Sequence, residues 1–545
     1  MAINESVREL FDAYLKSPCE QPFYIEPFFD ETNIMEKSDN ITIGKGADIK
    51  LKKTSVWLTS DPNLRYAYFS IHKMNDSFLL TSRHDNSCTS WLSCDGLSFN
   101  ITNKLGISPK PDFNNHNPYL HVQEEDGKKV IGLLRGRQVR AADGFQRDTG
   151  VQYHPYSRGA IDYTSNVIVD NGTERPPGGD SYDSLSTINY YNGLYYLHVR
   201  QNYTDRGSHG FVDPTVRNRT LRLALCDKSK KRIDNGVNIC RWWDTYRNDK
   251  KDIFIRDIYC GNVTNYNGTQ FNLGFPIIAD DKGLDKRGIH LNIILHSTNG
   301  IFFTHKDSQC DFYQIRDGEE MICLEGRSEP DQMGVCGMVE NNEHTEYYLY
   351  TLIKGPGIKQ NKIHCFSIEK DRFNCISCLG EAEGYIIMKS PKEFGDLFIN
   401  FETLQTGYIY CQLIGMNDNN VVYTTNKFTG NHLEHHVTFD TNTFTISDYR
   451  IKICLFKATL FSYKLNDKTK KKAEEEAEKK AEEETKKKAE EETKKKAEEE
   501  TKKKAEEEAK KKAEEETKKK AVEETKKKAV EETKKKAEEE AKKKA

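Results

Sequence analysis

The stretch Thr187-Ile-Asn-Tyr-Tyr-Asn-Gly-Leu-Tyr-Tyr-Leu-His-Val-Arg200 predicts two strands joined by a turn. Asn192 and Gly193 favour a tight hairpin because both tolerate positive φ, and the flanks are rich in aromatic and β-branched residues. Farther along, residues 221–227 alternate polar and apolar side chains like a half-buried strand, and residues 241–244 follow after a polar loop. We therefore predict an antiparallel sheet in this region.

The same pattern recurs along the chain. Each time, a strand rich in aromatic residues meets a polar turn with glycine and leads to another strand. The segments are residues 65–73, 91–99, 288–303 and 346–353. Recurrence of one hairpin unit indicates radial repetition, in which each four-stranded blade packs against its neighbours.

Three further segments are distinctive: Asp95-Gly96-Leu-Ser-Phe99, residues 180–184 before the strand 195–200, and residues 257–263 before Gly274-Phe-Pro276. They resemble the glycoside-hydrolase-type five-bladed β-propeller proteins, which group with the arabinanase and invertase folds. Residues 366–377, 384–389, 397–400 and 406–413 are similar to the β-sandwich that often follows such propellers. The resemblance covers roughly residues 22–460 and implies an all-β fold, a five-bladed β-propeller followed by a β-sandwich.

A chain of 545 residues exceeds what one core usually supports, so we expect several domains. They are an N-terminal amphipathic helix in residues 1–20, a five-bladed β-propeller in residues 21–360, a β-sandwich in residues 361–465 and a Glu/Lys-rich repeat helix in residues 466–545. Residues 21–60 are interpreted as the first blade. In the first helix the apolar face consists of Val7, Leu10, Phe11, Tyr14 and Leu15. We expect this face to dock on the body, and a helix on a membrane surface is the alternative.

From residue 473 onward the chain repeats Ala-Glu-Glu-Glu-Thr-Lys-Lys-Lys with an eight-residue period. Each Glu block precedes a Lys block, which places Glu482 and Lys486 at i,i+4 in the favourable order and predicts a helix. A coiled coil needs an apolar seam about every 3.5 residues, whereas the Ala and Thr positions wander around this helix and only Val522 and Val530 add hydrophobicity. We predict a solitary helix that acts as a rigid spacer. A coiled coil, partial disorder and a protein partner bound through this helix are the alternatives.

The N-terminus, the cysteines and the histidines indicate the cellular compartment of the protein and whether it binds a cofactor. The N-terminus has charges throughout and no secretory signal, and no stretch is apolar enough to span a bilayer, so we predict a cytoplasmic protein. The 14 cysteines form no regular framework, and Cys375-Ile-Ser-Cys378 is the only CxxC, which indicates buried thiols in a reducing compartment. We expect no metal ion, because the side chains of the neighbouring His435 and His436 diverge on a strand. We expect no nucleotide cofactor either, because the sequence contains no phosphate loop and no dinucleotide motif. The lysines of the tail are matched by glutamates, which argues against nucleic-acid binding.

Glycoside hydrolysis usually requires two carboxyl groups across the scissile bond, and the resemblance implies that they lie around the propeller axis. Asp30 is the candidate acid of the first blade. Asp148 follows Arg147 in a pair similar to the Arg-Asp element with which invertase-like enzymes hold the sugar. Asp183, directly before the central hairpin, is the third candidate catalytic residue, and turn capping is the alternative for it.

The candidate substrate-binding residues are Arg147, Asp180, Tyr182, Arg200 and Trp242. Asp180 and Tyr182 share the segment of Asp183. Arg200 ends an apolar strand, where it can hold a carboxylate or a sugar hydroxyl or form a structural ion pair. Trp242 precedes Trp243, and because neighbouring strand residues point to opposite sides, only one of the two can stack on a sugar.

Two classes of function follow from these residues. The propeller either hydrolyses a glycosidic bond in its axial funnel or is a catalytically inactive scaffold that binds carbohydrate or a protein. The second class stays open because the chain lacks the first-blade Asn-Asp-Pro-Asn-Gly run and a Glu-Cys element for the general acid.

Overall fold

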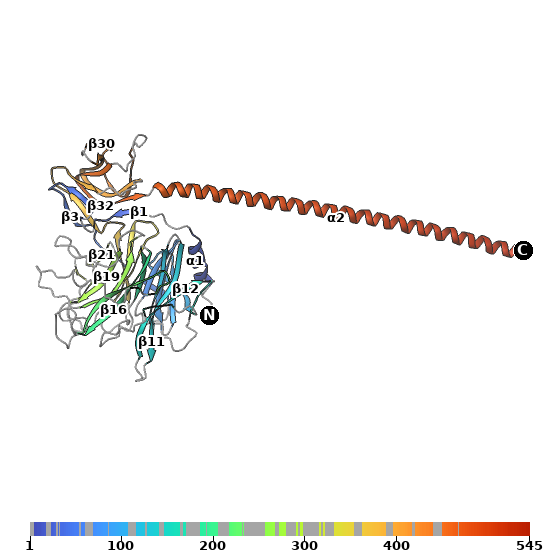
Figure 1. Cartoon of the computed structure of the whole chain (residues 1–545), viewed down its shortest axis with the longest axis horizontal. Coiled ribbons are helices and arrows are strands. Elements are labelled where there is room, and N and C mark those ends of the chain that lie inside the picture. The colour runs from blue at the N-terminus through green and yellow to red at the C-terminus, as the bar shows by residue number, and fades with distance from the viewer. Residues whose placement is uncertain are drawn as a thin grey trace. The chain divides into compact units, whose positions relative to one another are not determined.

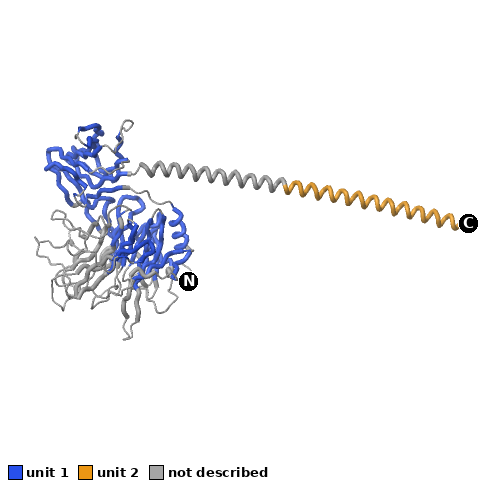
Figure 2. Tube along the Cα trace, viewed as in Figure 1, with its two compact units in different colours: residues 1–468 blue, residues 469–545 orange. Residues whose placement is uncertain are grey.

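The computed structural model contains two compact units, residues 1–468 and residues 469–545 (Figure 2). The described residues are 5–17, 23–28, 31, 33–53, 56–59, 69–84, 87–106, 116–125, 128–140, 146–157, 159–163, 167–170, 186–191, 193–204, 217–231, 233, 257–266, 272–279, 290–292, 295–297, 316–317, 320–321, 332–353, 362–388, 396–416, 420–439, 449–466 and 468–544.

Among these residues, five sheets of the first unit follow one another along the chain (Figure 1). The first sheet holds β5 (Trp57–Thr59), β6 (Phe69–Met74), β7 (Ser77–His84), β8 (Ser87–Ser93) and β9 (Ser98–Gly106). The second holds β10 (His116–Glu125), β11 (Lys128–Arg140), β12 (Gln146–Ser157), β13 (Ala160–Ile161) and β14 (Val167–Asp170). The third holds β15 (Thr187–Tyr191), β16 (Leu194–Thr204) and β17 (Arg217–Cys226), and the fourth holds β18 (Asp257–Asn265), β19 (Asn272–Ala279), β20 (His290–Asn292) and β21 (Leu295–Ser297). The fifth holds β24 (Gln332–Glu340), β25 (Glu346–Ile353), β26 (Lys362–Glu369) and β4 (Lys50–Lys53), and β22 (Arg316–Asp317) pairs separately with β23 (Glu320–Met321).

The predicted central hairpin is formed by β15 and β16. Tyr191 pairs with Leu194 as the last pair before the turn, and Gly193 adopts a φ of 80°. A positive φ is what a two-residue hairpin turn requires, and glycine adopts it without steric cost. β17 pairs with β16 and contains most of the predicted strand 221–227, whereas residues 241–244 lie outside the described residues.

The five sheets are joined in a closed ring by one edge strand of each. β6 contacts β10, β10 contacts β15, β15 contacts β18, β18 contacts β24, and β24 contacts β6. Sheets that meet through their inner edge strands in a cycle form a propeller-like arrangement, which confirms the predicted, mostly β architecture. Five blades remain a prediction, because much of the chain between residues 280 and 331 lies outside the described residues.

Buried side chains fill the spaces between neighbouring sheets. Separate clusters join the first and second sheets, the second and third, and the fifth and first. Their members include, in this order, Met74 and Leu120, Leu134 and Leu197, and Phe69 and Tyr350. Helix α1 (Glu5–Lys16) closes the first of these clusters, where Val7 and Phe11 are fully buried and the other apolar residues of the predicted face pack around them.

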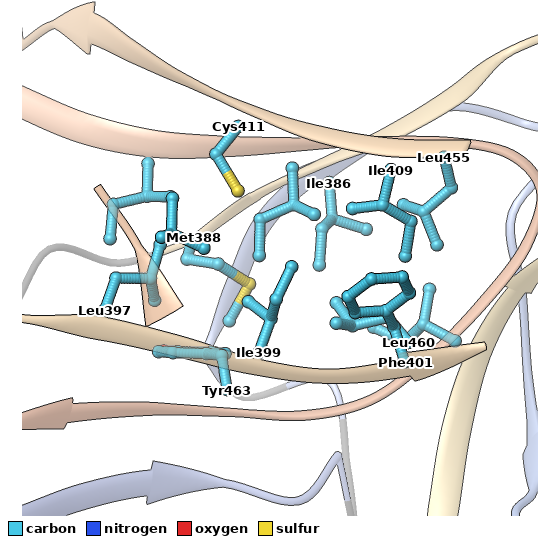
Figure 3. Packing of buried hydrophobic residues seen from close by; sticks show 14 of the residues in the cluster. Ile386, Met388, Leu397, Ile399, Phe401, Ile409, Cys411, Leu455, Leu460 and Tyr463 are labelled. Atoms are coloured by element: carbon cyan, nitrogen blue, oxygen red, sulfur yellow. The ribbon is translucent and has the colours of Figure 1, made fainter. Parts of the chain in front are cut away.

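A sixth sheet of nine strands forms the C-terminal part of the first unit. Its strands are β1 (Phe23–Glu26), β2 (Ile34–Lys37), β3 (Thr42–Lys45), β27 (Asn374–Cys378), β28 (Gly384–Met388), β29 (Leu397–Gly415), β30 (Val421–Thr424), β31 (Asn431–Val437) and β32 (Tyr449–Asn466). The long strands β29 and β32 pair on both sides of an irregularity between Thr403 and Tyr408. The sheet encloses one core in which Ile409 and Leu455 face Phe401 and Leu460 (Figure 3). The two-sheet sandwich stays a prediction, since the strands pair as one continuous sheet.

The N-terminal segment takes a different path from the one expected. Residues 21–60 were predicted to be the first blade, but β1, β2 and β3 pair with β32, β28 and β27 of the C-terminal sheet. β4 then pairs with β26 at the far edge of the fifth sheet. The reason is that strands with the same local pattern accept any partner with a matching apolar face, and the partner is chosen by tertiary packing.

The second unit is one helix, and helix α2 begins at Lys468 and ends at Lys544. Its i,i+4 pairs form as the sequence predicts, with 2.9 Å between Lys519 Nζ and Glu515 Oε1 and between Lys520 Nζ and Glu516 Oε1. The predicted charged C-terminal helix is thereby confirmed. Over the described residues, neither α1 nor α2 has a stretch long and apolar enough to cross a membrane.

Candidate functional site

The predicted site residues fall into two groups. Asp30, Asp180, Tyr182, Asp183 and Trp242 lie outside the described residues. For Arg147 and Asp148 in β12 and Arg200 in β16, the structure describes the backbone position alone. Phe28, two residues before Asp30 in the sequence, belongs to the core of the C-terminal sheet.

The backbone places Arg147, Asp148 and Arg200 at corresponding ends of two sheets. In the second sheet, the first residue of β10, His116, pairs with Gly136 of β11. Two residues farther along β11, Gln138 pairs with Asp148 of β12. In the third sheet Thr187, the first residue of β15, pairs with His198, so Arg200 lies two residues beyond that point on β16. These positions therefore lie where the edge strands β10 and β15 begin.

The two edge strands also run in the same direction. His121 Nδ1 lies 3.1 Å from Ile188 O. The Gln123 side-chain amide donates from Nε2 to Tyr190 O at 2.6 Å and accepts at Oε1 from Tyr190 N at 2.7 Å. A step of two residues along β10, from His121 to Gln123, matches a step of two residues along β15, from Ile188 to Tyr190. The two strands are therefore parallel, and both begin on the same side of the ring.

At the other end of β10, the structure brings together a polar cluster that the sequence analysis did not identify. Glu125 Oε1 lies 2.9 Å from His121 Nε2, and Glu125 Oε2 accepts a hydrogen bond from the Tyr195 hydroxyl of β16. Lys230, in the turn after β17, donates to the Tyr195 hydroxyl at 2.7 Å, and its ammonium lies over the rings of Tyr195 and Tyr153 at 4.1 and 4.5 Å. We call these five residues the Glu125 cluster.

The electrostatics keep Glu125 ionised. Burial by itself raises the pKa of this carboxyl, but the hydrogen bonds from His121 and Tyr195 and the nearby charges outweigh burial and lower it overall. Burial lowers the pKa of Lys230, and the charge of Glu125 opposes that shift. The pKa of Tyr195 is raised by burial and by its hydrogen bond to Glu125. A carboxylate with both oxygens occupied by donors holds the second and third sheets together.

Distance excludes Glu125 from the predicted site. Glu125 pairs with Lys128 of β11, and Asp148 pairs with Gln138 of the same strand. The two partners are ten residues apart on β11, which is about 30 Å along a strand. Two carboxyl groups that act on one glycosidic bond lie roughly 5 to 10 Å apart. The signal for the cluster was nonetheless in the sequence, since His121, Gln123 and Glu125 alternate along β10 and so share one face.

Two further sequence motifs have structural roles. The His435 ring lies 4.4 Å from the Phe428 ring, whereas the neighbouring His436 stacks on Phe398 at 4.8 Å, so the two side chains diverge as predicted. Cys375 and Cys378 are buried and neither forms a disulfide bond. Across the described part of the chain, no group of three His, Cys, Asp or Glu side chains is placed to hold a metal ion.

No protein-family model and no curated protein matches the chain. Among solved structures, an endo-arabinase from Bacteroides thetaiotaomicron is similar at 10% identity over 58% of this chain and 96% of that chain, with a TM-score of 0.35. An exo-β-1,3-galactanase from Phanerochaete chrysosporium is similar at 8% identity over 77% of this chain and 100% of that chain, with a TM-score of 0.33. A Bombyx mori β-fructofuranosidase is similar at 9% identity over 85% of this chain and 98% of that chain, with a TM-score of 0.34.

These values are low, so the propeller-like description rests on the ring of sheets and its closed cycle of edge-strand contacts. The chain has a propeller-like fold, and the solved structures to which it is similar include an arabinase, a galactanase and a fructofuranosidase.

Proposed function

We propose that the ring of sheets is a glycoside-hydrolase-like propeller that acts on or binds carbohydrate at the end where β10 and β15 begin. The observation that supports the proposal is the common position of Arg147, Asp148 and Arg200 at that end of two neighbouring sheets. Carboxyl groups carry out glycoside hydrolysis, and arginines hold carboxylates and hydroxyl groups with several donors at once.

In this proposal Asp148 and Asp183 supply the two carboxyl groups. One gives a proton to the leaving oxygen, and the other acts as nucleophile or base. Asp30 stays the candidate for a further acid. The sugar is bound by Arg147, Asp180, Tyr182, Arg200 and Trp242.

The alternative is a catalytically inactive member of the same fold that binds carbohydrate or a protein without hydrolysis. Fold and function are separable, because the same scaffold hosts different sites. Both versions of the proposal keep the cytoplasmic location. Nine cysteines of the described residues form no disulfide bond.

Hydrolysis of a panel of aryl glycosides and oligosaccharides by the full chain tests the proposal, with Asp148→Asn and Asp183→Asn as variants. Asp227→Asn is the matched control, because Asp227 follows β17 next to the Cys226–Tyr195 pair, at the opposite end of the third sheet from Arg200. Loss of hydrolysis in both variants but not in the control is the expected result. Unchanged hydrolysis in both variants would reject the site.

Binding measurements with the same oligosaccharides separate the two versions. Binding without hydrolysis by the wild-type chain would select the scaffold. A chain that neither binds nor hydrolyses any member of the panel would overturn the carbohydrate proposal.

We also propose that the tail is a rigid spacer. Its 77 residues span about 115 Å at about 1.5 Å per residue. A protein partner that binds along the charged helix is the second role open to it, and sedimentation of the full chain with and without residues 469–545 would report self-association through the tail.

A further inference from the structure

Two segments far apart in the sequence run side by side between the C-terminal sheet and the ring. On the sheet side, β3 pairs with β27, with Gly44 opposite Cys375. On the ring side, β4 pairs with β26, with Lys50 opposite Ser367. Between the two ladders, Gly46 N donates to Phe373 O at 3.0 Å and Ala47 N donates to Arg372 O at 2.8 Å. Residues 42–53 and 365–377 therefore form one double-stranded connection, which we call the clasp.

The clasp is tightest at Gly46. A Cβ atom at this position would overlap the carbonyl group of Arg372 and lie 3.0 Å from Asn374 O. Backbone atoms cannot swing aside as a flexible side chain can, so only glycine allows this approach. Gly44, two residues earlier on the same strand, has no atom within 4 Å of such a Cβ.

On one side of the clasp, Asp371 is anchored in the ring. Its Oδ1 accepts hydrogen bonds from the Tyr347 hydroxyl of β25 at 2.7 Å and from the Tyr266 hydroxyl, which follows β18. These donors come from two neighbouring sheets, and the carboxyl group is buried. Asp371 itself has a φ of 58°, a conformation that non-glycine residues rarely adopt, so its position is held by its surroundings.

On the other side, Arg372 is anchored in the C-terminal sheet. Its guanidinium donates from Nε to Asn400 Oδ1 at 2.9 Å and from Nη2 to Asn431 Oδ1, and it lies 4.3 Å from the centre of the Phe461 ring. The side chain is 2% exposed. Buried charged groups need such partners, because the loss of one leaves a charge without solvation.

We propose that the clasp is a conformational device that makes the integrity of the fifth sheet depend on the C-terminal sheet. β4 forms the outer edge of the fifth sheet by pairing with β26, and it follows β3 of the C-terminal sheet a few residues later in the chain. The C-terminal sheet in turn needs β1, β2 and β3 from the N-terminal segment. The fifth sheet and the C-terminal sheet each lack strands without the clasp. Local unfolding of one should therefore be accompanied by local unfolding of the other.

Hydrogen exchange of the full chain, followed by mass spectrometry of peptides, tests this inference with Gly46→Ala and the matched control Gly44→Ala. In Gly46→Ala, peptides of β24–β26 and peptides of β27, β28 and β32 should all exchange faster, by a similar factor of roughly tenfold or more. Gly44→Ala should exchange like the wild type. Faster exchange confined to the sheet or to the ring would overturn the proposal.

A milder variant keeps the test decisive if Gly46→Ala fails to fold. Tyr347→Phe removes one donor to Asp371 and leaves the ring packing in place. The expected result is again faster exchange on both sides of the clasp, including β27 and β28, which Tyr347 does not pair with. A change restricted to β24–β26 would show that ring and sheet open independently.

Discussion

The Tyr195 hydroxyl of β16 donates a hydrogen bond to the Glu125 carboxylate of β10 and so joins two neighbouring sheets of the ring. Lys230 donates to the same hydroxyl oxygen, so Tyr195 links a carboxylate to an ammonium. This relationship stabilises the boundary between the second and third sheets with groups that are largely withdrawn from water.

Tyr195→Phe should destabilise this boundary. The substitution keeps the ring but removes a hydrogen bond to a charged group, which we expect to lower the free energy of unfolding by about 1.5 to 3 kcal/mol. Urea unfolding measures the change. The control is Tyr191→Phe on the same hairpin, whose hydroxyl bonds no other described residue and should matter little. Equal effects of the two substitutions would contradict the role given to the Tyr195 hydroxyl.

Gly132→Ala should displace the ring of Tyr153. A Cβ atom at Gly132 would overlap Tyr153 Cζ and Oη, and the ring is fully buried between the second and third sheets. We expect a loss of about 1 to 3 kcal/mol in unfolding free energy, as for other overpacked cores. Gly44→Ala, which has open space around the added methyl, should stay within about 0.5 kcal/mol of the wild type. A neutral Gly132→Ala would show that Tyr153 is free to move.

His72 should make the protein sensitive to acid. The pKa of this histidine is lowered to about 3, mainly by burial and also by the nearby His121, while a hydrogen bond with the Leu120 backbone opposes the shift. The folded state therefore keeps the ring neutral, while the unfolded chain takes up a proton below a pH of about 6.5. The stability that depends on the neutral ring is complete above that pH and is lost as pH falls toward 3.

His72→Leu tests this dependence. At pH 7 the variant is expected to have a lower free energy of unfolding than the wild type. This difference should shrink as pH falls from about 6.5, by up to about 1.4 kcal/mol per pH unit, because only the wild type loses stability through His72. Unfolding free energies of both proteins at pH 7, 6 and 5 measure the difference. A deficit that stays constant across this range would contradict the argument.

The tail should melt as a solitary helix. Exposed Glu-to-Lys pairs contribute only about 0.2 to 0.5 kcal/mol each, but many such pairs lie along one helix. Val522 and Val530 are 56% and 60% exposed, so they do not form a buried seam. A peptide of residues 473–545 should show broad melting at a temperature that does not change over a hundredfold dilution, measured by circular dichroism. Concentration-dependent melting with a dimer or trimer mass in sedimentation would select the coiled coil.

The sequence by itself determined the elements whose cause is local. Asn192-Gly193 between two aromatic strands specified the hairpin of β15 and β16, and the Glu and Lys blocks specified α2. The spacing of Val7 and Phe11 likewise specified which face of α1 is buried. In each case the interacting residues lie within a few positions of one another, so the pattern contains the answer.

Only the tertiary structure decided how distant strands pair. β3 and β27 are more than 300 residues apart in the sequence, and nothing in the pattern of residues 42–45 distinguishes a strand of the first blade from a strand of the C-terminal sheet. The Glu125 cluster has the same origin, because Glu125 meets Tyr195 and Lys230 only when β10 and β16 are brought together. A period of two indicates that a strand has two faces, but the packing of the whole chain selects what each face meets.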